Sequence, residues 1–68
     1  MTLEQVKDIV WKATLQLAKE YRGSDYGRTY AQGMVNGMAK AFAEAGFISE
    51  DEAKDVGASS ANYLEWHC

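Results

Sequence analysis

The residues best suited to catalysis or metal binding are one histidine and one cysteine, adjacent at positions 67 and 68. Neighbouring side chains point in different directions, so His67 and Cys68 do not form the hydrogen-bonded couple that activates a thiol. A structural zinc site takes about four ligands, and this pair supplies two. The sequence therefore predicts a non-enzymatic chain with no catalytic residue, no metal site and no cofactor.

The segment spanning residues 22–29 has the composition of a phosphate-binding loop, with two glycines, two arginines and several hydroxyl side chains. A Walker loop places four residues between its glycines, continues with Lys and Ser/Thr, and follows a strand. Here three residues separate Gly23 from Gly27, and Arg28 comes next. We therefore interpret the segment as a connection between two helices.

Four carboxylates at positions 50, 51, 52 and 55 have the composition of a calcium site. The alternating acidic residues and the central glycine of a calcium loop are absent. Ser49 and Glu52 instead fit a capping box, and acidic residues in a first helical turn are favoured by the helix dipole. The cluster is therefore expected to cap a helix and to be solvated.

Charge is divided unevenly along the chain, whose net charge is −3. Residues 1–40 carry six Lys/Arg and four Asp/Glu, a net +2, whereas residues 41–68 carry one Lys and six Asp/Glu, a net −5. This polarity favours either a tail folded onto the basic half or two chains that meet antiparallel. Neither half has the positive density typical of phosphate binding. Nucleic acid is thus the weaker alternative, with Lys19, Arg22 and Arg28 as its contacts.

The chain is short for a self-sufficient fold. Its 68 residues, 47% hydrophobic and 25% charged, suit one domain over residues 1–68. A core of this size stabilises a chain only marginally, and a single cysteine allows no intrachain disulfide, so we favour a homodimer over a monomer. The lone cysteine fits a reducing compartment and charges interrupt every apolar run, so we expect a cytoplasmic protein with no membrane segment.

Hydrophobic spacing predicts an all-α fold, an antiparallel helical hairpin closed by a shorter third helix. The first helix runs from Thr2 to about Arg22 and shares its apolar residues on one face. That face holds Leu3, Val6, Ile9, Val10, Ala13, Leu17 and Tyr21.

The third helix begins at Ser49 and buries one row of residues, although low helix propensity over residues 57–60 favours fraying or bending there. That row is Ala53, Val56, Ser60 and Leu64.

The second helix runs to about Ala45, with Gly46 as its stop and either Ser24 or Asp25 as its N-cap. Thr29, with a glutamine three residues later, offers a rival capping box. Its expected inward residues are Ala31, Met34, Val35, Met38, Ala41, Phe42 and Ala45.

Between Tyr30 and Gly46, large and small residues each recur at every fourth position. Because residues four apart lie above one another on a helix, the small row forms a furrow beside a bulky ridge. A glycine inside a helix costs about 0.5–1 kcal/mol relative to alanine, so we expect a neighbouring helix to lie against Gly33 and Gly37. That neighbour is either the first helix of the same chain or a second copy. The packing residues are Gly33, Gly37, Met34, Met38, Ala41 and Phe42.

Trp11 and Leu15 point about 100° away from the centre of the first helix's apolar face. Such an offset indicates either that the third helix packs there or that the two residues form an exposed binding patch. The tail aromatics Tyr63 and Trp66 join them as candidates for partner binding.

The run from Tyr26 to Met34 (YGRTYAQGM), followed by GFISE at positions 46–50, resembles short orphan proteins from accessory regions of temperate bacteriophages, such as the lambda exo-xis region. The resemblance implies a small host-takeover factor that binds a bacterial protein. It brings no motif of known role, so it assigns no functional residue. The sequence thus predicts a protein–protein interaction module, with a nucleic-acid-binding regulator and a structural assembly subunit as alternatives.

Overall fold

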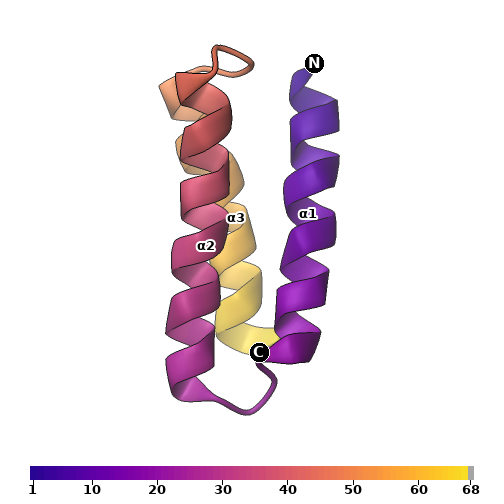
Figure 1. Cartoon of the computed structure of the whole chain (residues 1–68), viewed down its shortest axis with the longest axis vertical. Helices are drawn as coiled ribbons and strands as arrows, with labels where there is room; N and C mark the ends of the chain where they lie inside the picture. The colour runs from indigo at the N-terminus through magenta and orange to yellow at the C-terminus, as the bar shows by residue number, and fades with distance from the viewer. Residues whose placement is uncertain (68) are drawn as a thin grey trace.

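The computed structural model describes residues 1–67, which form three helices joined by two short loops: α1 Leu3–Glu20, α2 Asp25–Glu44 and α3 Glu50–His67. Successive helices are antiparallel, so α1 and α3 run in the same direction (Figure 1). The predicted small three-helix bundle is confirmed. The third helix is not shorter, however, because α3 and α1 both have 18 residues. Cys68 lies outside the described residues.

Reciprocal capping boxes fix the N-termini of α1 and α3. The Thr2 hydroxyl accepts a hydrogen bond from the Gln5 backbone (3.2 Å), and the Gln5 side chain accepts one from the Thr2 backbone (2.8 Å). The predicted box at α3 is present in the same form, with distances of 3.0 and 2.7 Å between Ser49 and Glu52. Each box satisfies two backbone donors that a helix start leaves unpaired.

The N-terminus of α2 is set by Ser24, whose hydroxyl accepts a hydrogen bond from the Gly27 backbone (2.9 Å). The rival start at Thr29 is wrong, because its hydroxyl donates to the Asp25 carbonyl inside the helix (3.2 Å). Gly23 and Gly46 follow the ends of α1 and α2 with φ of 81° and 86°. Glycine adopts this left-handed conformation without strain, so the two glycines in the sequence predict where α1 and α2 end.

The core lies along the axis where the three helices meet. Its fully buried large residues are Val6, Val10, Thr14, Val35 and Leu64. Thr14 is the one among these with a polar side chain, and its hydroxyl donates to the Val10 carbonyl one turn earlier (2.7 Å). The buried hydroxyl is thereby satisfied without a partner on another helix.

The expected inward face of α2 is partly wrong. Ala31 and Val35 are buried as predicted, and Met38 and Phe42 are half-buried against the core. Another α2 residue, Ala39, is buried although it was not predicted to be. The buried face is therefore rotated away from the small row, and three residues predicted to face inward are exposed instead: Met34, Ala41 and Ala45.

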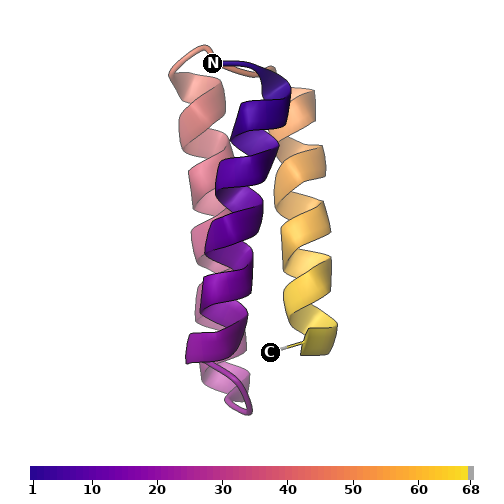
Figure 2. The same cartoon turned by 90° about the vertical axis from the view of Figure 1, so that its right-hand side faces the viewer.

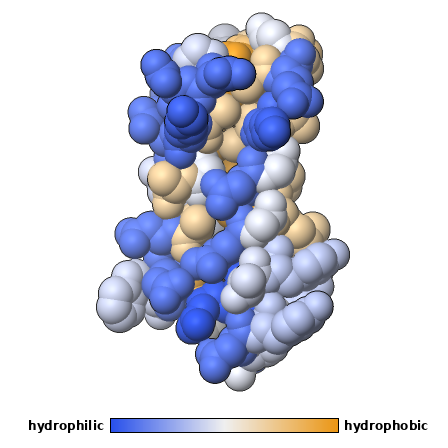
Figure 3. Space-filling model, turned by 90° about the vertical axis from the view of Figure 1, so that its left-hand side faces the viewer, coloured by the Kyte–Doolittle hydropathy of each residue, from blue (hydrophilic) through white to orange (hydrophobic). Residues whose placement is uncertain are grey.

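Gly33 and Gly37 of the small row have no neighbour among residues 1–67. A methyl group added at Gly33 or Gly37 would meet no atom within 4 Å. The expected intrachain crossing at these glycines is wrong, whereas their use in a dimer stays a prediction. On the side of the molecule where α2 lies, apolar residues are interspersed with hydrophilic ones (Figure 3).

The close helix crossing is at Gly57 of α3 instead. A methyl group there would clash with the Asn36 side-chain oxygen and lie 3.4 Å from the Asn36 Cα of α2. Beside it, the Gln32 amide donates to the Ala61 carbonyl (2.9 Å) and to the Glu65 carboxylate (3.0 Å). The α3 helix thus packs over the polar residues Gln32 and Asn36 of α2, and this explains the rotated face. It continues without interruption through residues 57–60.

Candidate protein-binding face

Trp11 of α1 and Tyr63 of α3 meet edge to face, with ring centroids 4.8 Å apart and ring planes at 74°. Trp11 thus packs on the third helix, which was the first of the two interpretations of its position. Even so, Trp11 and Leu15 each remain 41% exposed. Figure 2 views the molecule from the α1 side, with α3 beside α1 and α2 behind it. Trp11 therefore satisfies both interpretations, since it contacts α3 and stays accessible.

Two cavities lie along the junction of α1 and α3, one towards each end. We define the α1–α3 face as the residues lining these cavities together with Asp51 and Trp66, which lie outside their linings. The N-terminal cavity, about 320 Å³, is lined by Lys7, Trp11, Asp55, Val56, Ser59 and Ser60. The C-terminal cavity, about 420 Å³, is lined by Lys12, Leu15, Gln16, Ala18, Lys19, Arg22, Tyr63 and His67.

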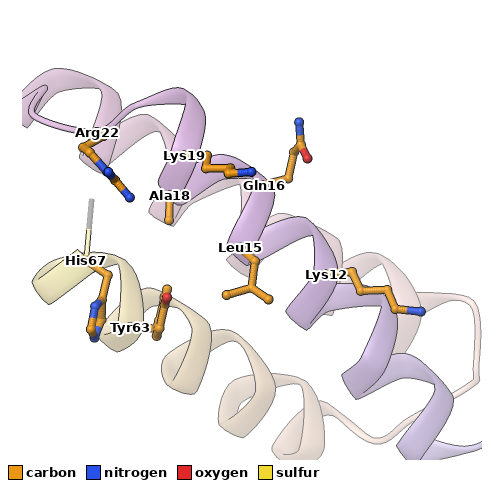
Figure 4. A pocket seen from close by; sticks show the side chains of 8 residues that line it. All are labelled: Lys12, Leu15, Gln16, Ala18, Lys19, Arg22, Tyr63 and His67. Carbon is orange, nitrogen blue, oxygen red and sulfur yellow. The ribbon is translucent and has the colours of Figure 1, made fainter.

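The C-terminal cavity combines an apolar centre with a basic rim. Leu15 and Tyr63 point into the space between the helices, and Arg22 reaches towards the end of α3 (Figure 4). Lys12 forms an ion pair with Asp8 (3.0 Å), but neither Lys19 nor Arg22 has an ion pair with any residue in the range 1–67. Among residues 1–67, no carboxylate lines this cavity. It therefore suits a ligand that presents negative charge beside apolar surface.

The opposite end of the face is acidic. Asp55 lines the N-terminal cavity and Asp51 precedes it by one helical turn on α3. Among the described residues, neither carboxylate forms an ion pair. Both side chains are exposed, and Lys7, which lines the same cavity as Asp55, is paired with Glu4 (3.7 Å). The face thus carries unpaired charge of opposite sign at its two ends.

Of the four predicted partner-binding residues, the structure brings together Trp11, Leu15 and Tyr63. Trp66 is 78% exposed and lies outside the lining of both cavities. The His67 ring stacks on Tyr63, with centroids 4.1 Å apart, so it extends the aromatic surface. Sequence reasoning missed Asp55, which lines the N-terminal cavity. The parallel direction of α1 and α3 places it there, and the spacing of residues within one helix does not show this.

The residues predicted for nucleic acid do not form one group. Lys19 and Arg22 line the C-terminal cavity, where Lys12 joins them. Arg28 instead forms ion pairs with Asp25 (3.5 Å) and with Glu65 of α3 (3.8 Å). Arg28 therefore serves the junction of α2 with α3, and its charge is already compensated.

A further cavity, about 350 Å³, lies between α2 and α3 and has no such charge preference. Its lining holds two lysines and two glutamates, Lys40, Lys54, Glu44 and Glu50.

Within residues 1–67, no three His, Cys, Asp or Glu side chains gather in a geometry that would hold a metal ion. None of the helices in this range combines the length and apolar character needed to cross a bilayer.

Comparison with protein-family models, curated proteins and solved structures finds no significant match to the chain. The α1–α3 face is therefore interpreted from its own geometry and charge.

Proposed function

We propose that the chain is a non-enzymatic protein–protein interaction module that binds its partner through the α1–α3 face. The observation that carries this proposal is the half-exposed pair Trp11 and Leu15, which line the two cavities of this face. The charges of Lys19, Arg22 and Asp55 at these cavities form no ion pair within residues 1–67. Aromatic anchors surrounded by polar residues are typical of the centres of protein interfaces.

A protein partner fits the charges of the face better than nucleic acid does. A phosphate backbone attracted to Lys19 and Arg22 would meet the carboxylates of Asp51 and Asp55 along the same face. Like charges brought together in this way oppose binding. A protein surface can present both signs of charge and also cover Trp11.

The resemblance to phage accessory proteins extends the proposal to a modulator of a bacterial host protein acting in the host cytoplasm. This extension rests on the residues of the resemblance alone. The assembly-subunit alternative uses the same face and differs in the size of the particle formed, which light scattering measures.

The test is a pull-down from the native host with tagged chain, repeated with Leu15→Glu and with Met34→Glu. Met34 is the matched control, because it is 38% exposed on α2, away from the α1–α3 face. We expect the wild type and Met34→Glu to retain a stoichiometric protein, whether a host protein or an untagged copy, and Leu15→Glu to lose it. Recovery of no stoichiometric protein, or equal recovery with both variants, would overturn the proposal.

A further inference from the structure

We infer that the partner of the α1–α3 face is a second copy of the chain, bound antiparallel about a two-fold axis near Leu15. This inference rests on the proposed function, since it names the occupant of the same face.

The register of α1 against α3 is fixed by the two cavities and the aromatic contact. Lys7 and Trp11 share one cavity with Asp55, while Lys19 and Arg22 share the other with Tyr63. Asp55 is therefore level with Lys7, twelve residues before Lys19 along α1. At 1.5 Å per residue, the acidic and basic ends are about 18 Å apart.

A two-fold axis exchanges the two ends of the face. In such an interface the same patch is used by both copies, so each contact occurs twice. An axis midway between Lys7 and Lys19 passes near residue 13, between Trp11 and Leu15. It places Asp55 of each copy opposite Lys19 of the other, and Asp51 towards Arg22. Lys7 is level with Asp55, but its charge is already paired with Glu4 of its own helix.

The result has the anatomy of a protein interface. The half-exposed Trp11 and Leu15 lie at its centre, and four pairs of complementary charges lie at its rim. A parallel arrangement would instead bring like charges together at both ends. Association would also add stability to a core that is small for an independent fold.

The row Gly33, Gly37 and Ala41 on α2 is the other candidate for self-association. No pattern of opposite unpaired charges at its two ends accompanies it, so we place the dimer on the α1–α3 face. Gly37→Leu is accordingly a control that leaves the dimer intact.

The experiment is sedimentation equilibrium of two charge-reversed variants, separately and mixed. The basic-end variant is Lys19→Glu with Arg22→Glu, and the acidic-end variant is Asp51→Lys with Asp55→Lys. All four side chains are exposed, so circular dichroism should show folded helices. The single variants Lys19→Glu and Asp55→Lys form a second, milder pair, because Asp51 lies in the first turn of α3, where the helix dipole favours an acid.

We expect the wild type to dimerise with a dissociation constant between about 1 μM and about 1 mM. Each double variant alone should raise the dimer dissociation constant at least about 100-fold, because like charges then face one another. An equimolar mixture should restore wild-type association, since both ends of the heterodimer are again complementary. A chain that carries all four reversals should also dimerise.

A wild type that stays monomeric at about 1 mM, or a mixture that stays monomeric when the wild type dimerises, would overturn the inference. Loss of the dimer in Gly37→Leu would also overturn it and would place the interface on α2. The proposed function can fail separately from this inference. If the chain is monomeric and captures a host protein in a way that depends on Leu15, the proposed function stands and the inferred dimer is refuted.

Discussion

The two interfaces that α3 makes differ in how completely they are closed. Against α2, it packs through the close crossing at Gly57 and through hydrogen bonds from Gln32, in the most extensive of the three helix pairings. Against α1, it packs through the Trp11–Tyr63 contact, with a cavity on each side. No side-chain hydrogen bond or ion pair joins α1 to α3 within residues 1–67.

This difference separates structure from function. The junction of α2 with α3 uses the side-chain amide of Gln32 internally, and the cavity between these helices has a lining of balanced charge. The α1–α3 face leaves apolar and charged groups accessible, although its inner edge helps to form the core. Substitutions at the first junction should therefore change stability, and substitutions at the second should change association.

The largest expected effect distinguishes two leucines. Leu64 is fully buried, so Leu64→Ala should lower the free energy of unfolding by about 2–5 kcal/mol. Leu15→Ala should lower it by about 1 kcal/mol or less, because Leu15 is 41% exposed. Urea denaturation followed by circular dichroism, at a concentration where the chain is monomeric, measures both. Equal losses would contradict the assignment of Leu15 to the accessible face.

A second comparison uses the same substitution at two glycines. Gly57→Leu should destabilise the chain by about 1–3 kcal/mol, because the added side chain meets Asn36 at the close crossing. Gly37→Leu adds a side chain where no atom lies within 4 Å, so thermal unfolding should show no loss of stability. A destabilised Gly37→Leu with an unchanged Gly57→Leu would show that the crossing is misplaced.

The interhelical hydrogen bonds of Gln32 should contribute about 1 kcal/mol. Gln32→Ala removes the bonds to the Ala61 carbonyl and the Glu65 carboxylate, whereas Gln16→Ala removes only an exposed bond to Glu20 within α1. We expect a measurable drop in the urea midpoint for the first variant and almost none for the second. The reverse order would argue that the hydrogen bonds of Gln32 do not stabilise the junction between α2 and α3.

The smallest effect has the opposite sign. Gly33→Ala should stabilise the chain by about 0.5–1 kcal/mol, because alanine is the better helix former and the added methyl group meets nothing. Differential scanning calorimetry measures the shift. A lower melting temperature would mean that the small row is in contact with another helix after all.

Local signals made the helix boundaries predictable. The pairing of Ser49 with Glu52, the cap at Ser24 and the stops at Gly23 and Gly46 depend on residues within one turn of each other. Such features are encoded by neighbouring residues, and the sequence contains them in full.

The orientation of α2 was not predictable in the same way. Helical periodicity groups apolar residues, and it favoured burial of Met34 and Ala41. The actual orientation depends on Gln32, which finds its acceptors on α3, 29 and 33 residues further along the chain. The fold prediction was therefore right, while the expected packing of a neighbouring helix against Gly33 and Gly37 was wrong within the chain.

The candidate site was predictable in part. The angular offset of Trp11 and Leu15 identified an accessible surface, and Tyr63 joins them there. The charges that accompany them were not predictable, because the register of α1 against α3 decides which ones gather. Arg28 shows the same limit, since the Glu65 that pairs with it is 37 positions away in the sequence.

The proposed use of the α1–α3 face can be measured on Trp11 itself. In Trp66→Phe, Trp11 is the one remaining tryptophan, and quenching of its fluorescence by neutral acrylamide reports its exposure. We predict that quenching decreases as protein concentration rises from about 1 μM to about 1 mM, and that Lys19→Glu with Arg22→Glu abolishes the decrease. Quenching that stays constant while sedimentation shows a dimer would contradict this use of the face.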